Sequence, residues 1–107
     1  MAANLAVNKT DFEKEVINSE VPVLVDFWAT WCRPCVAIAP FVAEIAEEVA
    51  ERGKVFKVDV DEERDLGEKY AIMSIPALLV FKGGREVDRM VGAGSKADIK
   101  AFFEKHL

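Results

Sequence analysis

The sequence predicts one α/β domain over residues 1–107, in which a mixed, mostly parallel central sheet carries helices on both faces. Three observations predict this fold class. The spacing of the apolar residues changes several times along the chain, as it does when helices and strands alternate. Residues 23–28 are apolar on both faces, which is typical of a strand covered on both sides. Gly83-Gly84 joins two apolar runs and predicts a hairpin turn, hence one antiparallel pair.

The first half of the chain predicts helix, strand, helix and strand, in that order. The first helix opens at Thr10, which can cap it, while Glu13, three residues further on, completes a capping box. The strand 23–28 follows it. A second helix is expected from 34 to 52, ended by Gly53, and its inner stripe consists of Ile38, Phe41, Val42, Ile45 and Val49. A β-branched run over 54–60 predicts the next strand.

The second half predicts a helix, a strand hairpin and a final helix. Residues 61–70 are expected to form a short polar helix, and 77–82 and 86–91 the two strands of the hairpin. Ser95 is placed to cap the last helix. Strands separated by helices are expected to pair in parallel through right-handed crossovers.

Composition and charge exclude several classes of protein. The net charge of -5, with no cluster of Lys or Arg, disfavours binding to nucleic acid or to an anionic membrane. No apolar stretch approaches the ~20 residues that a membrane span needs. The N-terminal Met1–Leu5 has neither the basic head nor the apolar core of a signal peptide, so we expect a cytoplasmic location. A small acidic domain of this kind is expected to be a monomer.

Cys32 and Cys35 are the only cysteines of the chain. Cytosolic thiols are normally kept reduced, so a lone pair at this spacing favours catalysis. A structural disulfide is one alternative, but closing so short a loop would constrain the unfolded chain little. Half of a zinc site is another, but zinc needs two further ligands and the only histidine is His106. No metal site is expected.

The position of the two cysteines suggests different roles for them. Cys32 follows a strand and a short loop and stands at or just before a helix N-terminus, where free N–H groups and the helix dipole favour a thiolate. Cys35 lies one turn further on, on the same side. We therefore expect an exposed, acidic Cys32 to attack a substrate disulfide. A sheltered Cys35 would then displace the product and leave the two cysteines oxidised.

Asp26 interrupts the apolar central strand. Burial of a carboxylate is costly unless it is paired, and burial raises its pKa. Such a group near two thiols could take the proton of Cys35, directly or through water. Lys57, in the next strand, is the best candidate for its partner, and the alternative is that Asp26 only hydrogen-bonds a strand end. Trp31, in the loop, is expected to stay partly exposed and to contribute to an apolar rim.

These residues belong to an ordered set of segments that resembles the thioredoxin family over essentially the whole chain. A bare pair of cysteines at this spacing is weak evidence, whereas the complete set at matching separations is specific. Asp26, Lys57 and Gly92 also stand where that family would have them. The matching segments are Val25-Asp26-Phe27-Trp28-Ala29, Trp31-Cys32, Pro34-Cys35, Ile38-Ala39-Pro40, Ser74-Ile75-Pro76 and Phe81-Lys82-Gly83-Gly84.

The resemblance implies the thioredoxin fold and a protein-disulfide reductase that works by dithiol–disulfide exchange. It implies that Cys32 attacks, that Cys35 resolves, and that Asp26 with Lys57 forms a buried acid–base pair. It also implies a cis Pro76 that faces the disulfide. The usual electron donor of the family is a flavoprotein, NADPH-dependent thioredoxin reductase, and the resemblance implies no bound cofactor.

The resemblance further implies a substrate site, in which an extended segment pairs with the backbone at Ile75 in the manner of an added strand. The expected substrate-binding residues are Trp31, Arg33, Pro34, Ile75, Pro76, Gly92 and Ala93.

Three positions depart from the pattern of the family. Arg33 stands where Gly is usual, Val36 where Lys or Arg is common, and Ala77 where Thr is common. A positive charge has thus moved from behind Cys35 to beside Cys32, where we expect it to stabilise the thiolate and make the protein a stronger oxidant. Two alternatives stay open: an enzyme specialised for oxidation, isomerisation or a dedicated partner, and a non-catalytic docking subunit that uses the apolar rim.

Overall fold

The predicted central strand is found at the centre of a four-stranded sheet. It is β1 (Val23–Trp28), and its residues are fully buried except for the half-buried Trp28. The sheet has the order β2-β1-β3-β4, with β2 (Lys54–Asp59), β3 (Ala77–Lys82) and β4 (Arg85–Val91). The structure, a computed structural model, describes residues 5–107.

The sheet is mixed, as expected, but its parallel share is smaller than the alternation of strands and helices predicted. β1 pairs in parallel with β2, whereas β3 is antiparallel to both β1 and β4. The connection between β2 and β3 contains α3 (Arg64–Lys69) but does not carry the chain back along the sheet. Ala77, at the start of β3, pairs with Phe27 near the end of β1, where β2 also ends. The chain therefore enters β3 at the end of the sheet where β2 ended, and β3 runs in the opposite direction to β2.

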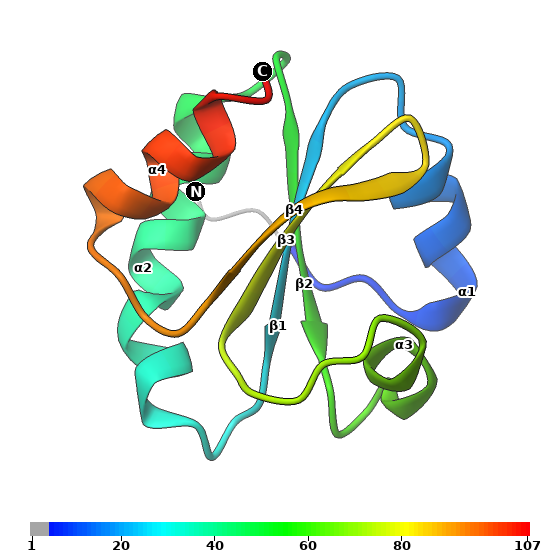
Figure 1. Cartoon of the computed structure of the whole chain (residues 1–107), viewed down its shortest axis with the longest axis vertical. Coiled ribbons are helices and arrows are strands. Elements are labelled where there is room, and N and C mark those ends of the chain that lie inside the picture. The colour runs from blue at the N-terminus through cyan, green and yellow to red at the C-terminus, as the bar shows by residue number, and fades with distance from the viewer. Residues whose placement is uncertain (1–4) are drawn as a thin grey trace.

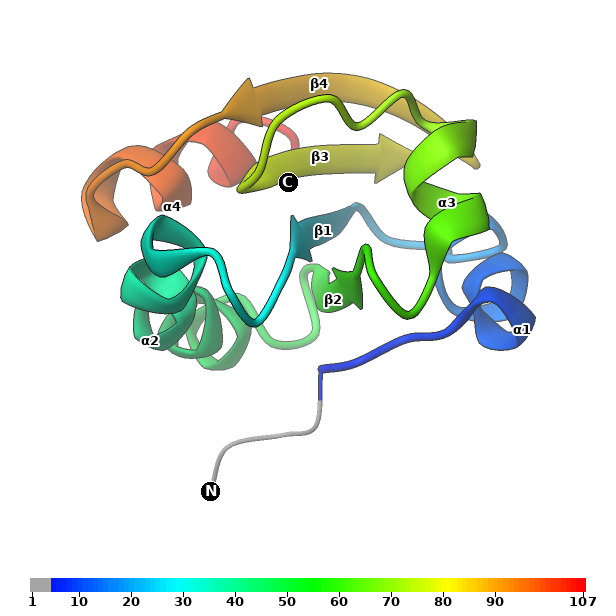
Figure 2. The same cartoon turned by 90° about the horizontal axis from the view of Figure 1, so that it is seen from below.

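Helices cover both faces of the sheet, which explains why β1 is apolar on both faces (Figures 1 and 2). On one face lie α3 and α1 (Lys9–Phe12), which continues as the π-helix η1 (Glu13–Ile17). On the other lie α2 (Arg33–Glu48) and α4 (Lys96–Glu104). Alternate residues of β1 enter two separate apolar clusters, one on each side of the sheet.

Two of the expected helix ends are wrong, and one is confirmed. The first helix is capped by Asn8, whose side-chain oxygen accepts the N–H of Asp11 at 2.9 Å, so Thr10 lies inside the helix and forms no capping box. The second helix ends at Glu48, so Gly53 does not end it. The cap at Ser95 is as predicted, with its hydroxyl accepting the N–H of Asp98 at 3.0 Å.

Gly53 is required for packing and not for helix termination. A Cβ added there would lie 2.7 Å from Cδ2 of Leu107 and 2.9 Å from Cζ of Phe103. The glycine thus lets the C-terminal residues approach the connection between α2 and β2. Sequence alone gave no sign of this contact, because the two segments are about fifty residues apart.

Within residues 5–107, no helix combines the length and the apolar character that crossing a membrane requires. Residues 1–4, on which the argument about a signal peptide partly rested, lie outside the described residues.

Candidate active site

The two cysteines form a disulfide at the start of α2. Cys32 is the N-cap of the helix and Pro34 occupies its first turn, a position where a missing N–H costs nothing. The backbone N–H of Cys35 donates to Sγ of Cys32 at 3.2 Å, and the two Cα atoms are 5.2 Å apart. The predicted position of Cys32 at a helix N-terminus is therefore confirmed, and one of the free N–H groups of that terminus points at its sulfur.

The disulfide is more enclosed than expected. Cys35 is 1% exposed, as a sheltered thiol should be, but Cys32 is only 4% exposed, so the expectation of an exposed Cys32 is wrong for this oxidised state. The reason is packing, because Trp28, Val60 and Ile75 lie against the two cysteines.

The segment that leads into β3 passes directly beside the disulfide. The carbonyl oxygen of Ile75 lies 3.8 Å from Sγ of Cys32, and the Ile75–Pro76 peptide bond is cis, as the resemblance implied. The carbonyl of Pro76 accepts the N–H of Gly92 at 2.8 Å. The fold thus brings together three of the expected substrate-binding residues, which sequence alone could not place side by side. Ala93 follows Gly92 and is exposed.

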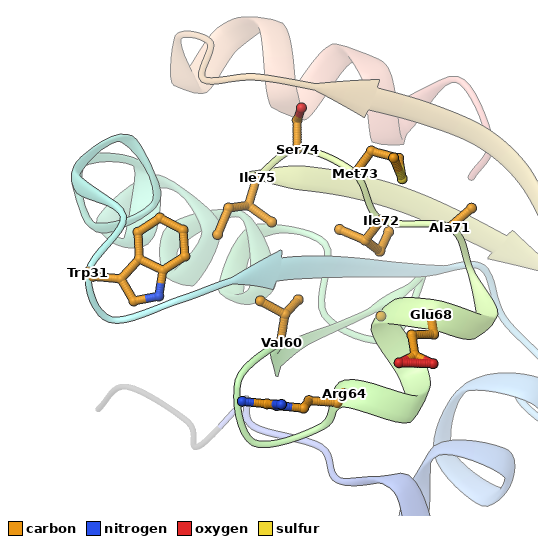
Figure 3. Close-up of a pocket in the computed structure, with 10 residues that line it drawn as sticks. Trp31, Val60, Arg64, Glu68, Ala71, Ile72, Met73, Ser74 and Ile75 are labelled. Atoms are coloured by element: carbon orange, nitrogen blue, oxygen red, sulfur yellow. The ribbon is translucent and has the colours of Figure 1, made fainter.

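Next to the disulfide lies an open groove of about 580 Å³, here called the Trp31 groove (Figure 3). Trp31 is 68% exposed, as expected, and its indole N–H donates to Asp61 at 2.8 Å. Ala71 to Ile75 line one side of the groove in Figure 3, with Val60 and Arg64 opposite. Its lining residues are Trp31, Val60, Arg64, Gly67, Glu68, Ala71, Ile72, Met73, Ser74 and Ile75.

Local sequence patterns do not indicate most of these lining residues. Met73, which is 91% exposed, belongs to no periodic stripe, and Val60 is the last residue of the β-branched run 54–60. No local pattern indicates that the two residues share a surface. The one available signal is position along the chain. Met73 lies just before Ile75-Pro76, and Val60 ends the predicted strand run before α3.

Asp26 is completely buried, and neither of its carboxylate oxygens has a hydrogen-bond partner. The alternative that it merely hydrogen-bonds a strand end is therefore wrong. Burial raises the pKa of Asp26 to about 7, and the positive charge of Lys57 partly offsets this rise. Asp26 and Lys57 lie opposite each other in the β1–β2 register. The Lys57 ammonium, however, lies 4.3 Å above the ring centre of Trp28, so it acts on Asp26 through its charge and not through an ion pair.

Arg33 is the first residue of α2 and is exposed. The first turn of α2 contains no acidic residue, so nothing in that turn opposes the positive charge that Arg33 adds beside Cys32. In the described part of the chain, no group of three or more His, Cys, Asp or Glu side chains is arranged to hold a metal ion.

Comparison with known proteins agrees with this geometry. The sequence model of the thioredoxin family matches residues 3–105. The chain is 49% identical to "Thioredoxin 1" of Nostoc sp. and 41% identical to "Thioredoxin" of Haemophilus influenzae, each over the full length of both chains. It is 48% identical to "Thioredoxin M-type, chloroplastic" of Chlamydomonas reinhardtii, over 95% of this chain and 73% of that one. The chain therefore belongs to the thioredoxin family of thiol–disulfide oxidoreductases.

Proposed function

We propose that this chain reduces protein disulfides with Cys32 as the attacking thiol and Cys35 as the resolving thiol. The observation that carries this order is the asymmetry of the pair. Sγ of Cys32 caps α2 and accepts a backbone N–H, whereas Cys35 lies within the first turn of the helix. A helix N-terminus stabilises a thiolate, and the thiolate is the nucleophile.

In the first step, the thiolate of Cys32 attacks one sulfur of a substrate disulfide. The substrate S–S bond breaks, a mixed disulfide forms, and the leaving substrate sulfur takes up a proton. The N–H of Cys35 and the dipole of α2 stabilise the attacking anion.

In the second step, Cys35 loses its proton and its sulfur attacks Sγ of Cys32. The second substrate thiol leaves, so the substrate has gained two electrons and the Cys32–Cys35 disulfide has formed. Asp26 is our candidate for the proton acceptor, directly or through water, because a carboxyl with a pKa of about 7 exchanges protons near neutrality. The role of Lys57 is to oppose the effect of burial and keep part of the Asp26 population ionised.

Substrate docking is proposed along the surface where the groove meets the disulfide. An extended segment would pair with the backbone at Ile75 and contact Trp31. The position of the Ile75 carbonyl beside Cys32 supports this arrangement. We propose the same role for Arg33, Pro34, Pro76, Gly92 and Ala93. NADPH-dependent thioredoxin reductase as the electron donor, a monomeric state and a cytoplasmic location are part of the same proposal.

Trapping of the intermediate tests the order of attack. The Cys35→Ser variant, reduced and mixed with insulin, should accumulate a mixed disulfide at Cys32 that mass spectrometry detects. Cys32→Ser should neither trap nor turn over, and failure of Cys35→Ser to trap would contradict the assignment. The double Ser variant separates the docking-subunit alternative, which predicts that partner binding and phenotype survive without either thiol.

A further inference from the structure

We propose that Arg89 is a positioning residue for substrate binding, an inference that rests on the proposed function. Its guanidinium holds the start of the segment between α3 and β3, here called the α3–β3 segment (residues 70–76). This segment forms one side of the Trp31 groove and carries the Ile75 carbonyl beside Cys32. Arg89 itself lies in β4 and acts on the site through that segment.

Arg89 binds the two carbonyl groups with which the α3–β3 segment begins. One terminal nitrogen donates to the carbonyl of Tyr70 at 2.7 Å, and the other donates to the carbonyl of Ala71 at 3.3 Å. Carbonyls at the end of a helix lack partners within the helix, so donors from elsewhere can fix them. Ala71 has a φ of 53°, which a residue other than glycine rarely adopts, so the chain turns sharply at the point that Arg89 holds.

Glu86 orients the guanidinium. Its two oxygens accept from Nε and Nη2 of Arg89 at 2.6 and 2.8 Å, and such a bidentate pair fixes the plane of the group. Residues three apart in a regular strand point to opposite faces. Here the register shifts, with Asp88 opposite Val80 but Glu86 opposite Phe81, so a bulge at Val87 brings residues 86 and 89 to the same face.

The far end of the α3–β3 segment is held by the same edge of the sheet. Gly92, which follows β4, donates its N–H to the carbonyl of Pro76 at 2.8 Å. Figure 2 shows the connection running from α3 to the start of β3, where Ala77 pairs with Val91 at the end of β4. Positions 89 and 92 therefore fix both ends of the segment. Between these ends lie Met73, which is exposed at the groove, and Ile75, which contacts the disulfide.

Loss of Arg89 should weaken substrate binding without changing the sulfur chemistry. A segment that must become ordered when substrate binds lowers the affinity, because binding must then offset the lost conformational entropy. For a short segment we expect the affinity to fall about threefold to tenfold. In dithiothreitol-driven reduction of insulin, Arg89→Ala should therefore raise KM about threefold to tenfold and leave kcat nearly unchanged. Reduction of hydroxyethyl disulfide, which is too small to need the groove, should proceed at the wild-type rate.

Three further variants and one measurement distinguish a positioning role of Arg89 from a general loss of structure. Arg89→Lys keeps the charge but cannot span two carbonyls and a carboxylate, so its KM should also rise. Arg85→Ala removes an exposed arginine from the same strand and should leave KM unchanged. Glu86→Gln keeps Arg89 and should raise KM by a smaller factor. Hydrogen exchange in Arg89→Ala should accelerate at the amides of residues 71–75, while exchange in β1 stays as in the wild type.

The inference is overturned if Arg89→Ala has the wild-type KM for insulin, or if Arg89→Lys restores it. An equal loss of activity toward insulin and toward the small disulfide would also overturn it, since the thiol site itself would then be disturbed. If Arg89→Ala does not fold, the Glu86→Gln variant provides the test. An unchanged KM for insulin in Glu86→Gln would then overturn the inference. A wild-type protein that reduces neither disulfide would instead refute the proposed function.

Discussion

Replacing Asp26 by Asn is expected to stabilise the oxidised protein, and to do so more strongly as the pH rises. In the unfolded chain the carboxyl has a pKa near its ordinary value of 3.8, whereas burial raises the pKa to about 7 in the fold. Between these two values the unfolded chain has lost the proton and the folded chain has kept it. The free energy of unfolding of the wild type therefore falls as the pH rises from about 4 to about 7, and then levels off.

The size of the effect follows from the gap between the two pKa values. At 1.36 kcal/mol per pKa unit, the gap corresponds to about 4 kcal/mol at pH 8 and to almost nothing at pH 4. Asn has the shape of the protonated carboxyl and carries no charge, so it should remove this cost. A buried charge without a direct partner is the case in which neutral replacement stabilises a protein.

Guanidinium unfolding of the oxidised wild type and of Asp26→Asn, at about pH 4, 6 and 8, measures the effect. Asp11→Asn removes an exposed carboxylate and serves as the control, with an expected change within about 0.5 kcal/mol at each pH. A stabilisation of equal size at all three pH values, or a loss of stability at pH 8, would refute the assignment of the cost to a buried carboxylate charge.

Two further predictions follow from the site and from the packing. Arg33→Gly should make the protein more reducing by up to about 20 mV, because an exposed charge contributes at most ~1 kcal/mol and ~1.4 kcal/mol corresponds to ~30 mV. Equilibration with glutathione measures the redox potential of each protein. Added salt should reduce the difference between the two potentials, because salt screens an exposed charge. A Gly variant that is equally or more oxidising than the wild type would contradict the prediction. Gly53→Ala should lower the free energy of unfolding by about 1–3 kcal/mol, because its Cβ would overlap Phe103 and Leu107. Denaturant unfolding measures the change. If Gly53→Ala were as stable as the wild type, the side chains of Phe103 and Leu107 would be able to move aside without cost.

Much of the fold was predictable because its signals are local. The strand 23–28 matches β1, because a run that is apolar on both faces is buried on both sides only when it lies between two layers of helices. The position of Cys32 at a helix N-terminus is predictable because strand, loop and helix follow one another within a few residues. The cap at Ser95 is predictable because its partner, the N–H of Asp98, lies three residues away.

Neighbours along the chain are enough to predict the order of helices and strands, the position of the cysteine pair and the burial of Asp26. Four other features arise only when distant segments meet: the direction of β3, the position of Lys57 over Trp28, the enclosure of Cys32 and the contact of Arg89 with the α3–β3 segment. These features depend on how the connections close and on which distant side chains then meet. One extra residue in β4, for example, brings Glu86 and Arg89 to the same face, and no periodic pattern records such an insertion.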